Sequence, residues 1–265
     1  MWVMCPAGCS RVSEPLVKLD RHDLCVVLSL NRPERHNALV PELLLSLIEA
    51  LRDDRCQQAM AVLLRAEGRS FSTGGDLLGF QHHQSTLGEY AYELVGLLNQ
   101  FIIALYTHPA PVVCAVQGQV TGGSLGFLLA SDHVVMHRSA NITPWYTEVG
   151  FSPDGGWTAM LPDIIGRQQS LHWLATNACY DADYCHALGV VQEVVDDDCD
   201  TAAFDWLAVN GQIKLGSTRN SKKLINNNIN DIKDKLEYER EVFVEQIQSP
   251  EARRGIEQFL RRNTR

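Results

Sequence analysis

The sequence predicts one α/β domain followed by an all-helical C-terminal region. Over residues 17–200, short runs of branched apolar residues alternate with longer segments of helical periodicity, a pattern typical of βα units. After residue 201 no strand pattern remains. The length of 265 residues suits one large domain with a small appendage. We therefore expect a poorly defined tail at residues 1–16, a core at 17–200 and a helical region at 201–265.

The composition narrows the classes of function. Residues are 45% hydrophobic and 21% charged, as expected of a packed core. The net charge is −9, whereas proteins that bind nucleic acids are typically rich in basic residues. The apolar runs at 43–51 and 125–130 are shorter than a membrane span, and no signal-peptide pattern opens the chain. We predict a cytoplasmic protein with no membrane or nucleic-acid partner, whose eight scattered cysteines are reduced.

The first half of the core is expected to contain two strands and two helices. Residues 24–30 (LCVVLSL) form an apolar run that ends in an Asn-Arg-Pro turn signal, so a strand is expected there. Pro41–Arg52 has apolar residues at helical spacing and a proline suited to a first turn. Residues 59–64 predict a second strand, and Leu87–Tyr106 predicts a long helix that ends before a proline-rich turn.

The second half repeats the alternation. Val112–Val116 and residues 134–136 predict strands on either side of a glycine-opened helix at 122–131, and residues 190–195 predict a last strand. Helices are then expected at 222–246 and 250–261, with an Asn-rich turn or helix end at 226–230. This region carries an apolar stripe that the core alone does not obviously cover, which favours self-association: Leu224, Ile225, Ile229, Ile232 and Leu236.

Three glycine-containing segments have residue types that suit chemistry on the backbone. They are residues 71–77 (FSTGGDL), 118–126 (GQVTGGSLG) and 150–156 (GFSPDGG). Paired glycines let a ligand approach bare N–H groups, and N–H groups at a helix start favour an anion. The third segment presents Asp154, for which a helix N-cap is the structural alternative. Phosphate-loop patterns are absent, and the histidines form no familiar ligand set, so no metal site is expected.

The order of these segments resembles the crotonase family, the enoyl-CoA hydratase/isomerase superfamily. The resemblance covers roughly residues 24–195 and rests on ordered motifs. They are Leu30-Asn31-Arg32-Pro33 with Asn37-Ala38-Leu39, Arg69-x-Phe71-Ser72-x-Gly74-Gly75-Asp76-Leu77, Pro111-Val112-x-x-Ala115-Val116-x-Gly118-x-x-x-Gly122-Gly123, Ala130-Ser131-Asp132, residues 150–156, and Ala182-x-x-x-x-Ala187-Leu188-Gly189-Val190-Val191. The resemblance implies a crotonase-like spiral of ββα units with a C-terminal α-helical trimerisation region, and a homotrimer or a hexamer built as a dimer of trimers.

The same resemblance implies an acyl-CoA substrate, with coenzyme A as part of it and no separate cofactor. The thioester oxygen is expected between the backbone N–H groups of Gly75 and Gly123. Such donors are preorganised for an enolate oxyanion and do not titrate. The remaining substrate-binding residues implied by motif position are Ala38, Thr73, Gly74, Asp76, Leu77, Gly122, Trp145 and Tyr146.

The reaction is narrowed by two departures from the family pattern. The hydratases use two glutamates, and those positions align with Gly126 and Tyr146, so hydration is disfavoured. Glu148 is interpreted as a surface charge. Asp154 remains, and it is similar in position to the single acid of one group of enoyl-CoA isomerases. Burial near Phe151, Trp145 and Trp157 is expected to raise its pKa.

Two alternatives stay open. A 4-chlorobenzoyl-CoA dehalogenase resembles this chain around residues 123–132 and has its nucleophilic aspartate in the same turn. That enzyme also needs a histidine and a tryptophan, where this chain has Asn99 and Tyr146. A non-catalytic acyl-CoA-binding or scaffold protein is the alternative of another class, and the retention of Asp154 argues against it.

Overall fold

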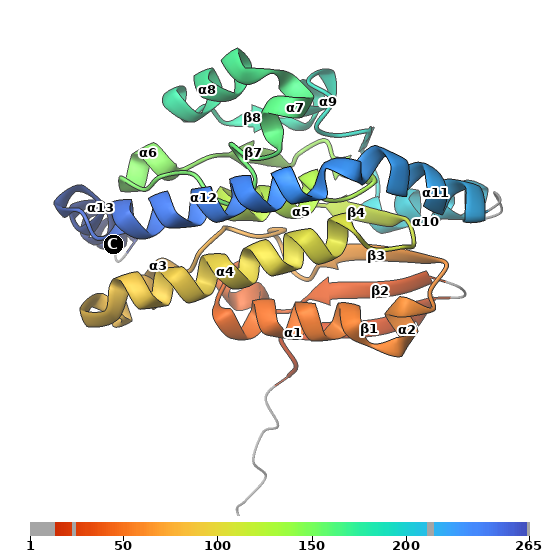
Figure 1. The fold of residues 1–265 in the computed structure, drawn as a ribbon, viewed down its shortest axis with the longest axis horizontal. Coiled ribbons are helices and arrows are strands. Elements are labelled where there is room, and N and C mark those ends of the chain that lie inside the picture. The colour runs from red at the N-terminus through yellow and green to blue at the C-terminus, as the bar shows by residue number, and fades with distance from the viewer. Residues whose placement is uncertain (1–13, 23–24, 211–214, 264–265) are drawn as a thin grey trace, which may run out of the picture.

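The computed structural model describes residues 14–22, 25–210 and 215–263, so most of the predicted tail lies outside the described residues. A six-stranded sheet with the order β1-β2-β3-β4-β6-β9 forms the centre (Figure 1). β1 is antiparallel to β2, and the other neighbours are parallel. Its strands are β1 (Val17–His22), β2 (Cys25–Leu30), β3 (Ala61–Ala66), β4 (Val112–Val116), β6 (His133–His137) and β9 (Glu193–Val195). A second sheet contains β5 (Gln119–Thr121), β7 (Asn141–Thr143) and β8 (Tyr180–Asp181).

Helices connect the strands and make up the C-terminal region. Two of them, α1 and α4, have the predicted bounds, and Pro41 is the first residue of α1. The described α-helices are α1 (Pro41–Arg52), α2 (Asp54–Gln57), α3 (Leu77–His82), α4 (Leu87–Tyr106), α5 (Leu125–Leu129), α6 (Tyr146–Val149), α7 (Leu161–Ile165), α8 (Arg167–Thr176), α9 (Ala182–Ala187), α10 (Cys199–Asn210), α11 (Leu215–Ile225), α12 (Ile229–Ile247) and α13 (Pro250–Asn263). None of the helices in the described ranges is long and apolar enough to cross a membrane.

Both faces of the main sheet are covered, which explains why its central strands are continuous apolar runs. In β2, Val26 and Leu28 pack into the larger core with α1 and α4. Val27, between them, packs on the opposite face with Ala203 and Leu207 of α10. The predicted α/β class is therefore confirmed, and the core continues from the sheet into the helices of the C-terminal region.

The C-terminal helices lie against the core rather than apart from it. In Figure 1, α12 runs alongside α4, and α13 lies at the end of the molecule near α3 and α6. Ile232 and Leu236 are buried within their own subunit, so this part of the stripe is covered without a partner. Leu224 and Ile225, on α11, are 72% and 76% exposed.

Several predicted bounds need correction. The expected helix at 122–131 is a 3-10 turn, Gly122–Ser124, followed by the short α5. The expected helix at 222–246 is interrupted by another 3-10 turn at Asn226–Asn228, within the predicted Asn-rich turn. The strand expected at 59–64 is β3, shifted by two residues, and the one expected at 190–195 is the shorter β9. Several other elements were not predicted, because they are short, polar or weakly periodic: β1, β5, β7, β8, α2, α3 and α6–α10.

Candidate active site

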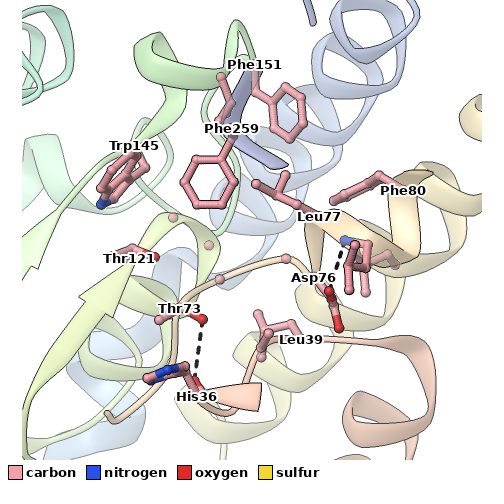
Figure 2. A pocket seen from close by; sticks show the side chains of 18 of the residues that line it. His36, Leu39, Thr73, Asp76, Leu77, Phe80, Thr121, Trp145, Phe151 and Phe259 are labelled. Atoms are coloured by element: carbon pink, nitrogen blue, oxygen red, sulfur yellow. Dashed lines mark hydrogen bonds between the residues drawn. The ribbon is translucent and has the colours of Figure 1, made fainter. Parts of the chain in front are cut away.

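A cavity of about 760 Å³ is lined by all of the catalytic and substrate-binding residues that were predicted from motif position. Its lining combines the three glycine-containing turns with side chains from α3, α4, α12 and α13. The predicted residues that line it are Ala38, Thr73, Gly74, Gly75, Asp76, Leu77, Gly122, Gly123, Trp145, Tyr146 and Asp154. Figure 2 shows one view of this cavity.

The first two glycine turns lie against each other at the floor of the cavity. The Leu39 N–H donates to the Gly74 carbonyl at 2.7 Å, and the Asp76 N–H donates to the Leu39 carbonyl at 3.0 Å. Gly74 has φ +69°, and a Cβ there would lie 2.8 Å from the Thr121 carbonyl oxygen and 3.4 Å from Gly122 Cα. Glycine at residue 74 therefore permits the close approach of the two turns.

This geometry leaves two backbone donors free beside the cavity. The backbone of Leu39 forms hydrogen bonds with Gly74 and Asp76, the residues on either side of Gly75. The N–H of Gly75 therefore points away from Leu39. Gly123 lies in the 3-10 turn before α5, where N–H groups have no partner within the helix. Within the described ranges, no protein acceptor is found for either amide. Two such donors next to one cavity can hold an oxyanion.

Asp76 lines the cavity, but its carboxylate is already engaged. It forms ion pairs with Arg32 at 2.8 Å and Arg35 at 3.0 Å, and it caps α3 by accepting from the Leu78 N–H. Burial opposes its ionisation, but the hydrogen bond and charge of Arg32, followed by Arg35, lower the pKa of Asp76. These contacts fit a residue that fixes the turn carrying Gly75.

The two ends of the cavity differ in character (Figure 2). His36 and Thr73 lie at one side of the view, and Trp145, Phe259 and Phe151 lie at the other. The His36 ring is 3.0 Å from the Ser70 hydroxyl and 2.8 Å from the Arg69 guanidinium. With Arg35, these groups place the basic side chains of the lining on this side of the cavity, next to the carboxylate of Glu34. Ala38 also belongs to the lining.

The opposite end is apolar and largely aromatic. Phe151 packs edge-on against Phe80 of α3 and Phe243 of α12, with ring centroids 5.7 and 5.5 Å apart. Trp145, at φ +65°, packs edge-on against Phe259 of α13. The remaining apolar lining includes Leu77, Leu94, Leu98, Val149 and Leu260.

Trp157, which was expected near Asp154 together with Phe151 and Trp145, is not among the described residues that line the cavity. Its side chain is fully buried, and its indole N–H donates to the Gly122 carbonyl at 2.8 Å. Trp157 therefore supports the second glycine turn from behind.

Asp154 has its carboxylate directly beside the second free amide. A Cβ placed on Gly123 would lie 2.8 Å from Asp154 Oδ1. The Tyr146 hydroxyl donates to that same oxygen at 2.6 Å and to the Asp154 carbonyl at 3.0 Å. Asp154 is 7% exposed. Burial raises its pKa to about 7, while the hydrogen bond from Tyr146 opposes that rise.

The capping interpretation of Asp154 was wrong. The next helix, α7, begins at Leu161 and follows Met160 in the N-cap position. In the described part of the chain, the Asp154 carboxylate interacts with its own backbone amide, and no N–H of the following turn donates to it. The side chain is held instead by Tyr146.

The fold and this geometry agree with the comparisons with known proteins. The enoyl-CoA hydratase/isomerase family matches residues 21–264. The chain belongs to that family.

Individual relatives differ in the activity that their names describe. The 1,2-epoxyphenylacetyl-CoA isomerase of Escherichia coli is 30% identical over 244 residues, covering 89% of this chain and 91% of the relative. The 4-chlorobenzoyl coenzyme A dehalogenase-2 of Arthrobacter sp. is also 30% identical, over 69% of this chain and 67% of the relative. The crystal structure of an enoyl-CoA hydratase from Bacillus halodurans shares the fold, with a TM-score of 0.85 at 24% identity over 91% of this chain and 99% of the other.

The resemblance placed Gly126 and Tyr146 at the positions of the two hydratase acids, and at Gly126 there is no space for a side chain. A Cβ on Gly126 would collide with Ile102 and lie 2.5 Å from the Gly155 carbonyl oxygen. Tyr146 occupies the other position and binds Asp154. Glu148 is exposed, pairs with Arg262 and does not line the cavity, which confirms it as a surface charge.

The sequence did not predict the roles of two residues in this region. Tyr146 was expected to bind substrate and to lack the carboxylate of the hydratases, but its role as the hydrogen-bond partner of Asp154 was not predicted. Glu239, on α12, is buried and accepts hydrogen bonds from the turn that follows Asp154. A signal for Glu239 was present, because it is a charged residue at an apolar position of the stripe on α12.

Proposed function

We propose that this chain is an enoyl-CoA double-bond isomerase in which Asp154 moves the proton. The observation that carries the proposal is the buried Asp154 carboxylate next to the free Gly123 amide. Two other carboxyl residues line the described cavity: Asp76 is paired with arginines, and Glu34 is exposed. A 1,3-proton shift needs one base and a stabilised enolate, whereas hydration also needs a group that activates water.

In the proposed reaction, the residues of the site act in two steps. The Asp154 carboxylate removes a proton from C2 of a 3-enoyl thioester, and the electron pair of that C–H bond moves into the dienolate. The thioester oxygen takes the negative charge between the Gly75 and Gly123 amides. Protonated Asp154 then returns the proton to C4, which gives the 2-enoyl thioester and restores the carboxylate. A group with a pKa of about 7 can do both steps near neutral pH.

The two ends of the cavity support the orientation of the substrate. The aromatic end, with Phe80, Phe151 and Phe243, suits a wholly apolar acyl chain. The basic end, with Arg35 and Arg69, suits the phosphates of coenzyme A. Coenzyme A enters as part of the substrate, so the proposal includes no separate cofactor.

Dehalogenation is less well supported. Asn99 aligns with the histidine of the dehalogenases, but its amide donates to the Leu236 carbonyl at 2.9 Å and does not line the cavity. His36 is the histidine in the described lining, and it is held by Ser70 and Arg69 at the basic end. In the described lining, no residue therefore corresponds to a base that activates water on an aryl ester of Asp154.

A panel of thioesters tests the proposal. Purified protein is incubated with apolar 3-enoyl-CoA, 2-enoyl-CoA and 4-chlorobenzoyl-CoA, and the products are separated by chromatography. We expect turnover of the 3-enoyl thioester and no release of chloride. Halide release would favour the dehalogenase alternative, and tight binding without turnover of any member would favour a binding or scaffold role.

The rate is expected to depend on pH through Asp154. Because the carboxylate must be ionised to act as a base, kcat/KM should rise with pH and reach half of its maximum near pH 7. Tyr146→Phe removes a donor that stabilises the ionised form, so the half-maximum should move upward by about one pH unit. Tyr238→Phe is the matched control, because Tyr238 is 68% exposed. An unchanged profile in Tyr146→Phe would contradict this assignment.

We also propose a trimer or a dimer of trimers. The large exposed apolar residues Leu224, Ile225 and Val209 lie on α11 and α10, and exposed apolar patches are typical of interfaces. Sedimentation velocity at micromolar protein should show at least three times the monomer mass of 29.6 kDa. The double variant Leu224→Glu/Ile225→Glu should sediment more slowly. A parent protein that remains at the monomer mass would refute the expected assembly.

A further inference from the structure

The buried face of α12 contains one charged residue. Ile232, Leu236, Phe243 and Ile247 are its apolar members, and Glu239 lies between them with 4% exposure. A buried carboxylate is unfavourable unless hydrogen bonds compensate the loss of water. An apolar residue at this position would continue the stripe, so the contacts of Glu239 indicate what the charge does.

All contacts recorded for Glu239 go to the turn that follows Asp154. One carboxylate oxygen accepts from the Gly156 N–H at 2.8 Å. The other accepts from the Thr158 N–H and hydroxyl, both at 2.7 Å, and from the Ala159 N–H at 2.9 Å. The backbone donors cannot accept a proton in return, so this arrangement suits an ionised carboxylate. Burial raises the pKa of Glu239, and these donors counteract the rise.

Glu239 also acts on Asp154 through its charge. Among the described residues, the titratable groups that shift the pKa of Asp154 are Tyr146 of α6, through its hydrogen bond, and Glu239 of α12, through its charge. Leu98 of α4 is an apolar neighbour on another side, close to the same position beside Gly123. The Tyr146 hydrogen bond favours the ionised form of Asp154, whereas the negative charge of Glu239 disfavours it. The two groups therefore oppose each other.

We propose that Glu239 is a positioning residue for Asp154, which fixes the turn that carries the carboxylate and places a second negative charge behind it. The proposal rests on the proposed function of Asp154 as the base. It gives α12 two roles at the site, because Phe243, four residues after Glu239, lines the apolar end of the same cavity. The C-terminal region then contributes both to the wall of the cavity and to the strength of the base.

Glu239→Gln tests the proposal, since it keeps the shape of the side chain and removes its charge. The half-maximum of the kcat/KM profile should move downward by about one pH unit, opposite to the shift expected for Tyr146→Phe. Glu241→Gln is the matched control, because Glu241 is exposed on the same helix. A role in stability alone would lower the melting temperature and leave the profile where it was.

A direct titration separates this proposal from the proposed function. Carbon NMR of protein labelled at the aspartate carboxyl groups follows Asp154 in the absence of substrate, and Asp154→Asn identifies its signal. We expect the pKa of Asp154 to be lower in Glu239→Gln than in the parent. If Asp154→Asn is inactive but the titration and profile of Glu239→Gln match the parent, the positioning role is wrong and the proposed function stands. If Asp154→Asn is fully active, the proposed function fails, whatever the titration shows.

A second variant covers the case in which Glu239→Gln does not fold. Thr158→Val removes one donor to Glu239 and keeps the backbone donors. Loss of that donor favours protonation of Glu239, so the profile and the Asp154 titration should move in the same downward direction by a smaller amount. An unchanged profile and titration in the folded Thr158→Val protein would overturn the proposal.

Discussion

Asp154→Asn is expected to reduce turnover of a 3-enoyl thioester by about 100- to 10,000-fold, because general-base catalysis contributes about that much. The amide has nearly the shape of the carboxylate, and its oxygen can still accept from the Tyr146 hydroxyl. The fold and the affinity for acyl-CoA should therefore be retained. Steady-state kinetics gives the loss, and calorimetric titration with a product thioester gives the affinity.

Glu148→Gln provides the control for that experiment. It removes a carboxylate from the neighbouring helix α6, but one that is exposed and paired with Arg262. We expect the activity of the parent. If instead Glu148→Gln is inactive and Asp154→Asn is active, the proton is moved by another acid, and the assignment of Asp154 is wrong.

Gly123→Ala is expected to lower kcat/KM by about 100- to 1,000-fold, as expected when an oxyanion donor is misplaced. The added Cβ would lie 2.6 Å from Leu98 Cδ2 and 2.8 Å from Asp154 Oδ1. Both contacts are too short, so either the amide or the carboxylate must move. The same overpacking should reduce the free energy of unfolding by about 1–3 kcal/mol. Kinetics and thermal unfolding measure the two effects separately.

Gly216→Ala is the matched control, since a Cβ there meets nothing within 4 Å. Gly216 lies in α11, where alanine is favoured over glycine by about 1 kcal/mol, so this protein should be at least as stable as the parent. Its activity should be unchanged. Parental kcat/KM in a folded Gly123→Ala protein would show that the Gly123 amide does not hold the oxyanion.

The residues around the cavity were predictable because most of them belong to contiguous turns. The segments 71–77 and 118–126 each carry their glycines and neighbours in a fixed local order, so recognising the turns located the free amides. The placement of Asp154 in the segment 150–156 followed in the same way. Helices α1 and α4 were also predictable, since long amphipathic periodicity and a first-turn proline are local signals.

Contacts between distant segments were not predictable from local pattern. Tyr146 was assigned to the site from motif position alone, and its hydrogen bond to Asp154 depends on how α6 packs against the turn eight residues later. Glu239 lies more than eighty residues from Gly156, and only the packing of α12 brings the two together. Asp76 was expected at the substrate site from its motif position, but its ion pairs with Arg32 and Arg35 join it to another segment of the chain and have no local signal.

The proposed isomerase reaction can be observed by proton NMR of the parent protein with an apolar 3-enoyl thioester in heavy water. We predict that the 2-enoyl thioester accumulates, with deuterium at C4 wherever the proton on Asp154 exchanges with solvent before its return. Signals of a 3-hydroxyacyl thioester should remain minor, because the two other carboxyl residues of the described lining are not placed to activate water: Asp76 is paired with arginines and Glu34 is exposed. If the 3-hydroxyacyl thioester is the main product, or if the 3-enoyl thioester is recovered unchanged, the chain is not an isomerase of the proposed kind.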